Sequence, residues 1–89
     1  MEFTYEKSRI FLKGTDGAAI AEITFPIADG VATIDHTFVD SSLRGQGMAG
    51  KLVTAAVNAI RACGLHVRPT CSYAAKWFAD HPDQQDLLV

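Results

Sequence analysis

The chain has 89 residues and a formal net charge of −2. A chain of this length can bury one modest core, so residues 1–89 are predicted to form a single domain. The net negative charge argues against nucleic acid as a general partner, and no apolar run is long enough to span a membrane. The segment from Met1 to Lys13 does not resemble a signal peptide, which predicts a cytoplasmic protein with Cys63 and Cys71 as free thiols.

The first half of the chain is predicted to form three strands. Arg9–Lys13 alternates polar and apolar residues and is followed by a glycine-containing turn. Residues 18–28 alternate in the same way and predict a half-buried strand. Asp29-Gly30 favours a two-residue hairpin, because both central residues of a type I′ turn have positive φ, so residues 31–39 should pair antiparallel with the preceding strand. Four even-numbered residues are then expected to share one face: Ala32, Ile34, His36 and Phe38.

The second half predicts two helices and one strand. Residues 48–63 have helical periodicity, with polar residues on one stripe and Gly64 as a C-terminal cap. Residues 65–68 form a short strand before Pro69, and residues 72–80 form a second helix that ends at His81-Pro82. This order predicts an α/β (α+β) fold, with a mostly antiparallel sheet and one βαβ crossover that makes the last two strands parallel.

A glycine-rich loop, RGQGMAGK, lies between the third strand and the first helix, at Arg44 to Lys51. A helix amino terminus offers free N–H groups and partial positive charge, and glycines let a phosphate approach them. The loop matches two motifs. G-x-x-x-x-G-K from Gly45 resembles a nucleotide P-loop, although Leu52 stands where a Mg²⁺-binding Ser or Thr is needed. R-x-x-G-x-A from Arg44 is a pyrophosphate-loop pattern, and a purely structural turn is a third interpretation.

The charges are unevenly distributed along the chain. None of the ten acidic residues lies between residues 41 and 79. Five basic residues occur in that stretch: Arg44, Lys51, Arg61, Arg68 and Lys76. This asymmetry predicts a local anion site, and the alternative is that these side chains are simply solvated.

The loop resembles the acetyl-CoA motif, [QR]-x-x-G-x-[GA], of the GNAT superfamily of N-acetyltransferases. Together, DHTFVDSSLRGQGMAGKLV and RPTCSYAAKWFADHP are similar to its small Yjdj-type members, which carry His-Thr before the loop and Cys-x-Tyr after the next strand. The resemblance spans roughly residues 9–83. It implies a minimal GNAT-like domain that binds acetyl-CoA and acetylates an unidentified amine.

The resemblance also implies which residues hold the cofactor. The strand ending in Phe38 and Val39 would line the pantetheine and supply oxyanion donors. The pyrophosphate would be held by the loop residues Arg44, Gly45, Gln46, Gly47, Met48 and Ala49. Because the chain lacks the amino-terminal helices of larger relatives, its acceptor site should be open or completed by a partner. Exposed sheet edges allow a monomer or a weak dimer.

Three side chains are candidates for the chemistry. Cys71 opens a helix, a position that lowers a thiol pKa, and could accept the acetyl group or orient the thioester; a buried structural cysteine is the alternative. His36 is the nearest candidate base, although its place on an apolar face favours a hydrogen-bonded core histidine. Tyr73 could protonate the leaving sulfur or pack its ring.

Two features qualify this interpretation. Many Yjdj-type relatives have Glu after His-Thr, and this chain has Phe38, which leaves open a non-catalytic CoA-binding or protein-interaction module. Cys63, His66 and Cys71 are close in sequence but have no fourth ligand at standard spacing, so no metal site is expected.

Overall fold

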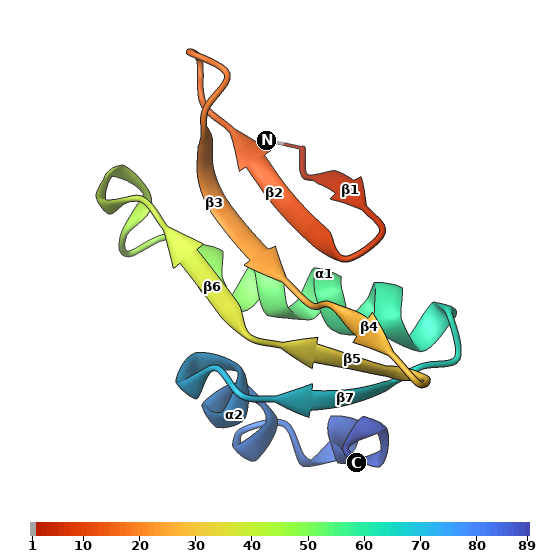
Figure 1. Ribbon diagram of the computed structural model, residues 1–89. Helices are drawn as coiled ribbons and strands as arrows, with labels where there is room; N and C mark the ends of the chain where they lie inside the picture. The colour runs from red at the N-terminus through yellow and green to blue at the C-terminus, as the bar shows by residue number, and fades with distance from the viewer. Residues whose placement is uncertain (1) are drawn as a thin grey trace.

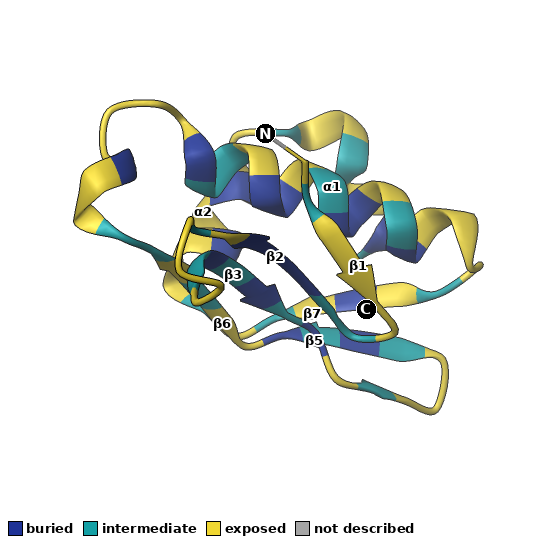
Figure 2. Ribbon diagram, turned by 90° about the horizontal axis from the view of Figure 1, so that it is seen from above, coloured by how far each residue is buried: buried dark blue, intermediate teal, exposed yellow. Residues whose placement is uncertain are grey.

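The computed structural model describes residues 2–89 and consists of a strand layer with helices on one side (Figure 1, Figure 2). The first sheet is antiparallel and has the order β1-β2-β3-β6, formed by Thr4–Glu6, Arg9–Lys13, Ala19–Thr24 and His36–Val39. The second sheet has the order β4-β5-β7, formed by Ile27–Ala28, Val31–Ile34 and His66–Pro69. In it, β4 and β5 are antiparallel, whereas β5 and β7 are parallel.

Two α-helices complete the architecture. α1 (Met48–Ala62) connects β6 to β7, and α2 (Ser72–Ala79) follows β7. Short 3₁₀ helices lie at Ser41–Leu43 and Pro82–Leu87. The predicted fold class is confirmed: the sheets are mostly antiparallel, one βαβ crossover makes one parallel pair, and there are two main helices. No helix among residues 2–89 has the length and apolar character needed to cross a membrane.

The predicted strand over residues 18–28 is two strands. It divides at Phe25-Pro26, so that β3 belongs to the first sheet and β4 to the second. Proline has no N–H to donate to a ladder, which explains the interruption. The predicted half-burial is nevertheless correct, because Ala21, Ile23 and Phe25 are buried, whereas Glu22 and Thr24 between them are only partly buried.

The predicted strand over residues 31–39 is also divided, at Asp35. The Asp35 N–H donates to the Thr24 carbonyl at 3.3 Å, and Thr24 is the residue opposite His36. Two residues therefore face one, which is a β-bulge, and the bulge reverses the faces of the residues that follow. The expectation of one shared face was wrong: Ala32 and Ile34 are buried, but His36 and Phe38 are exposed.

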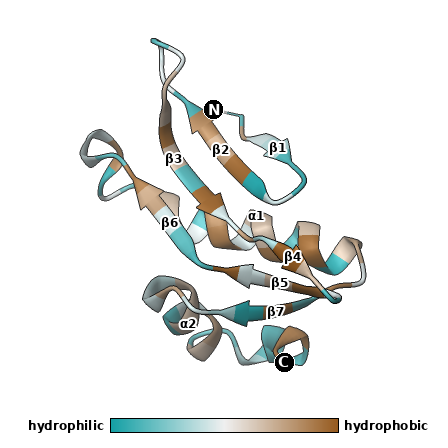
Figure 3. Ribbon diagram, viewed as in Figure 1, coloured by the Kyte–Doolittle hydropathy of each residue, from teal (hydrophilic) through white to brown (hydrophobic). Residues whose placement is uncertain are grey.

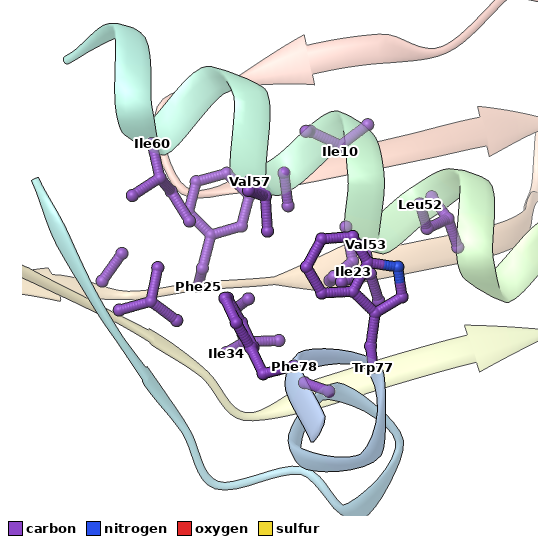
Figure 4. Packing of buried hydrophobic residues seen from close by; sticks show 14 of the residues in the cluster. Ile10, Ile23, Phe25, Ile34, Leu52, Val53, Val57, Ile60, Trp77 and Phe78 are labelled. Carbon is purple, nitrogen blue, oxygen red and sulfur yellow. The ribbon is translucent and has the colours of Figure 1, made fainter. Parts of the chain in front are cut away.

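The core lies between α1 and the strands, with α2 closing one end. α1 buries Leu52, Val53 and Val57 against Ile10 and Ile23 of the first sheet (Figure 4). From α2, Trp77 and Phe78 join the same cluster with an edge-to-face ring contact at 5.0 Å. The polar stripe of α1 faces solvent as its spacing predicts: Lys51, Thr54, Asn58 and Arg61 are exposed. The hydropathy colouring of α1 shows the same two-sided pattern (Figure 3).

Candidate active site

The two sheets separate at Ile34. The N–H groups of Thr70 and Cys71 both donate to the Ile34 carbonyl at 3.0 Å, which ends the β5–β7 pairing. Beyond this point β6 pairs with β3, and within residues 2–89 no ladder joins β6 to β7. Cys71 therefore lies at the junction where the two strands diverge, and one edge of β6 is left without a strand partner (Figure 1).

The free edge of β6 carries backbone donors. The Asp40 N–H donates to the Ile20 carbonyl of the β3 segment at 2.8 Å. Donor direction alternates along an antiparallel strand, so the N–H groups of Val39 and Thr37 point away from β3, towards the free edge. The N–H of Phe38 points the other way, towards β3. Of the two residues expected to supply backbone donors, only Val39 has its N–H at this edge.

The sulfur of Cys71 lies beside this edge. Its Sγ is 3.7 Å from Thr37 Oγ1, and the side chain is half-buried. Cys71 is also the N-cap residue of α2, although its side chain forms no capping hydrogen bond of ordinary geometry. The structure thus brings a free thiol, a hydroxyl and a helix amino terminus together.

These neighbours change the acidity of the thiol. Burial raises the pKa of Cys71, and nearby donors oppose this effect. The strongest donors are the amide of Ala74 and the hydroxyl of Thr37, followed by the amides of Tyr73 and Thr37. Together they outweigh burial, so the pKa of Cys71 is lower than that of an ordinary thiol. A lowered pKa agrees with the expectation for a cysteine at a helix start.

Replacing Thr37 with valine is expected to raise the pKa of Cys71, because the thiolate loses a hydroxyl donor. The rise would slow alkylation at neutral pH by about threefold, since less of the thiol would be ionised. Iodoacetamide labelling in a Cys63→Ser background, followed by mass spectrometry, measures the rate. Thr54→Val, an equivalent change on the exposed stripe of α1, is the control. Equal rates in the two variants would show that Thr37 does not stabilise the thiolate.

The glycine loop leads into α1 directly after β6. The Asp40 carboxylate accepts hydrogen bonds from the Ser42 N–H at 3.0 Å and from the Ser42 hydroxyl at 2.6 Å, which fixes the start of the loop. Gly45 and Gly47 have φ values of 81° and 68°, a region that disfavours side chains, and a Cβ at either position would meet no atom within 4 Å. The loop is therefore open to solvent.

The first turn of α1 suits an anion. Gly47 is the N-cap residue, no side chain caps the helix, and the first turn contains no acidic residue. Its free N–H groups and partial positive charge are therefore not neutralised by the chain itself. Arg44 is exposed at the same loop.

A groove of about 780 Å³ extends from this loop along the outer side of α1. Gly47 lines it from the loop, Gly50 and Lys51 line it from α1, and Tyr73 and Lys76 line it from α2. The Tyr73 hydroxyl lies 3.5 Å from where a Cβ of Gly50 would be, so Tyr73 contacts the groove and is not a core residue. The Lys76 ammonium forms an ion pair with Asp80 at 2.9 Å.

His36 lies on the other side of β6. Its side chain is 54% exposed, so the expectation of a core histidine was wrong. The bulge at Asp35 reverses the faces of the residues that follow it, which turns His36 away from the core. Its Nε2 is 3.6 Å from Glu22 Oε2. Neighbouring residues of a strand point to opposite faces, so Thr37 reaches Cys71 while His36 faces away from it. The structure thus brings Cys71 and Thr37 together and leaves His36 on the opposite face.

Sequence reasoning missed Thr37 and Glu22. Thr37 is part of the His-Thr pair, but the sheet face on which it lies cannot be predicted unless the bulge at Asp35 is known. Glu22 had no local signal, because only strand pairing brings it near His36. Among residues 2–89, no three His, Cys, Asp or Glu side chains gather in an arrangement that could hold a metal ion.

A comparison with protein families shows to which family the chain belongs. A family described as GCN5-related N-acetyl-transferase matches residues 9–87, nearly the whole chain. The chain belongs to this family. The resemblance to small GNAT proteins is therefore confirmed. Members of the GNAT family generally use an acyl-CoA.

Solved structures agree with the family. A GCN5-like candidate N-acetyltransferase from Staphylococcus aureus, determined by NMR, is 30% identical with a TM-score of 0.79, over 99% of this chain and 87% of that protein. The Escherichia coli ribosomal-protein-S18-alanine N-acetyltransferase has a TM-score of 0.66 at 14% identity, over 86% of this chain and 53% of its own. A Mycobacterium tuberculosis protein crystallised with CoA has a TM-score of 0.66 at 18% identity, over 85% of this chain and 48% of its own.

The last two similarities show a shared fold. This GNAT chain spans about half the length of those two larger proteins. No curated protein sequence matched it.

Proposed function

We propose that this GNAT protein transfers the acetyl group of acetyl-CoA to an amine. The observation that carries the proposal is the position of Cys71: a thiol of lowered pKa lies at the junction of the diverging strands, beside the free donors of β6. The open glycine loop follows the same strand. A thioester placed along β6 would have its phosphates at the loop and its acetyl group near Cys71.

The loop binds the pyrophosphate in this proposal. The amides between Arg44 and Ala49 approach the phosphate oxygens, because Gly45 and Gly47 present no side chain to block them. The guanidinium of Arg44 adds positive charge. The groove beyond the loop, with Lys51 on its wall, accommodates further parts of a polyanionic cofactor.

The chemistry proceeds through Cys71 in two steps. The Cys71 thiolate attacks the thioester carbonyl carbon, the free N–H of Val39 stabilises the oxyanion, and the bond from that carbon to the CoA sulfur breaks. The CoA thiolate leaves and takes a proton from Tyr73, which regains it from solvent. The amine then attacks acetyl-Cys71 at the free edge of β6, its proton passes through water to His36 on the other face of the strand, and the Cys71 thiolate is released.

The test of this function is a calorimetric titration with acetyl-CoA, run beside Mg-ATP. Saturable binding of acetyl-CoA without a response to Mg-ATP is expected, because Leu52 stands at the Mg²⁺-ligand position of a P-loop. Magnesium-dependent ATP binding, or no binding of acetyl-CoA, would contradict the proposal.

Turnover is tested separately, with a panel of amines, polyamines and peptides. Transfer to at least one acceptor is expected. Binding of acetyl-CoA without transfer to any of them would favour the non-catalytic module, in which the exposed Phe38 stands where relatives carry a carboxylate.

A further inference from the structure

A row of ionisable side chains crosses all four strands of the first sheet on the face away from α1. Its members are Glu6 of β1, Arg9 of β2, Glu22 of β3 and His36 of β6. Arg9 Nη1 is 3.4 Å from Glu6 Oε1, Arg9 Nε donates to Glu22 Oε1, and Glu22 Oε2 is 3.6 Å from His36 Nε2. Glu22 therefore connects an arginine to the candidate base.

Glu22 is the least exposed carboxylate of this row of side chains. Its side chain is 22% exposed, against 54% for both Glu6 and His36. Its partner Arg9 is itself fixed, because the guanidinium stacks over the ring of buried Phe11 at 3.9 Å from the centroid. One carboxylate oxygen is thus occupied by Arg9, and the other faces the imidazole.

Strand register explains why this carboxylate reaches the site. Glu22 lies directly opposite Phe38, and Thr24 lies directly opposite His36. Glu22 and His36 are therefore diagonal neighbours on one face of the sheet. Asp35, the other acid beside His36, is engaged elsewhere, since it accepts the Thr24 hydroxyl at 2.6 Å. A carboxylate that Phe38 cannot supply is provided at the same level of the sheet by the adjacent strand.

We propose that Glu22 is a positioning residue that holds the imidazole of His36 for proton abstraction from the acceptor amine. The inference rests on the proposed function. With Nε2 facing the Glu22 carboxylate, Nδ1 is the nitrogen that accepts the amine proton. The amine approaches the free edge of β6 from the face that α1 does not cover, where His36 is exposed, and its proton crosses to the imidazole through water.

The test compares Glu22→Gln with Glu6→Gln. Both substitutions remove one carboxylate that contacts Arg9, but only Glu22 reaches His36, so Glu6→Gln is the matched control. The first measurement needs no activity: three-bond NMR couplings report rotation about χ1 of His36. One rotamer is expected in the wild type and in Glu6→Gln, and averaging among rotamers in Glu22→Gln. Averaging already in the wild type, or the same couplings in all three proteins, would overturn the proposal.

The second measurement is steady-state acetylation of the best amine of the panel. In Glu22→Gln, kcat is expected to fall about tenfold, part of the roughly 100- to 10,000-fold that a general base contributes, with KM for acetyl-CoA unchanged. Glu6→Gln should stay within about twofold of the wild type. Equal kcat values in the two variants would overturn the role of Glu22. If the wild type acetylates no amine, the proposed function fails, and the couplings still decide whether Glu22 positions His36.

Discussion

Replacing Gly47 with glutamate is expected to weaken acetyl-CoA binding by about 100-fold or more, which corresponds to about 3 kcal/mol. Gly47 is the N-cap of α1, and the space above its Cα is open. A glutamate there would block the approach of phosphate oxygens to the loop amides and place a negative charge among them. Calorimetric titration of acetyl-CoA into the variant measures the loss.

The control for this substitution is Gly64→Glu. Gly64 follows the other end of α1 and has a φ of 71°, against 68° at Gly47, and neither position has an atom within 4 Å of a Cβ. Both variants should therefore lose a similar amount of stability, about 1–2 kcal/mol, from strain at positive φ. Thermal unfolding checks that both still fold. Similar affinities of the two variants for acetyl-CoA would contradict the assignment of the loop to the pyrophosphate.

Replacing Cys71 with serine is expected to reduce acetyl transfer by about 100-fold or more while acetyl-CoA still binds. A serine hydroxyl lacks the lowered pKa of Cys71, so the donors from Thr37 and α2 have no thiolate to stabilise. Incubation of the wild type with acetyl-CoA, without an amine, should add one acetyl group by intact mass. The Cys71→Ser protein should show no adduct.

Cys63→Ser is the matched control, since Cys63 is an exposed free thiol at the far end of α1. It should retain both the adduct and the activity. Full transfer by Cys71→Ser would rule out the covalent route. Loss of transfer by Cys71→Ser, with no adduct in the wild type, would show that Cys71 only orients the thioester.

Local periodicity was enough to determine several parts of this fold. The 3.6-residue pattern set the buried side of α1, since Leu52 and Ile60 are fully buried while Lys51 and Asn58 are exposed. The Asp29-Gly30 pair predicted the hairpin between β4 and β5, and both residues have the positive φ that its turn requires. The glycine loop was placed correctly at the start of α1. Each of these features depends only on residues that are close together in the sequence.

The sequence by itself therefore determined the two helices, the hairpin, the family and the glycine loop. The division of the predicted strands and the arrangement of the catalytic candidates were decided by tertiary structure. The bulge at Asp35 exists because β6 pairs with β3 in one register, and that register moves His36 out of the core and turns Thr37 towards Cys71. Glu22 reaches His36 only through the pairing of β3 with β6. A period-two pattern cannot reveal such a change of face, because one extra residue reverses it without altering the composition of the strand.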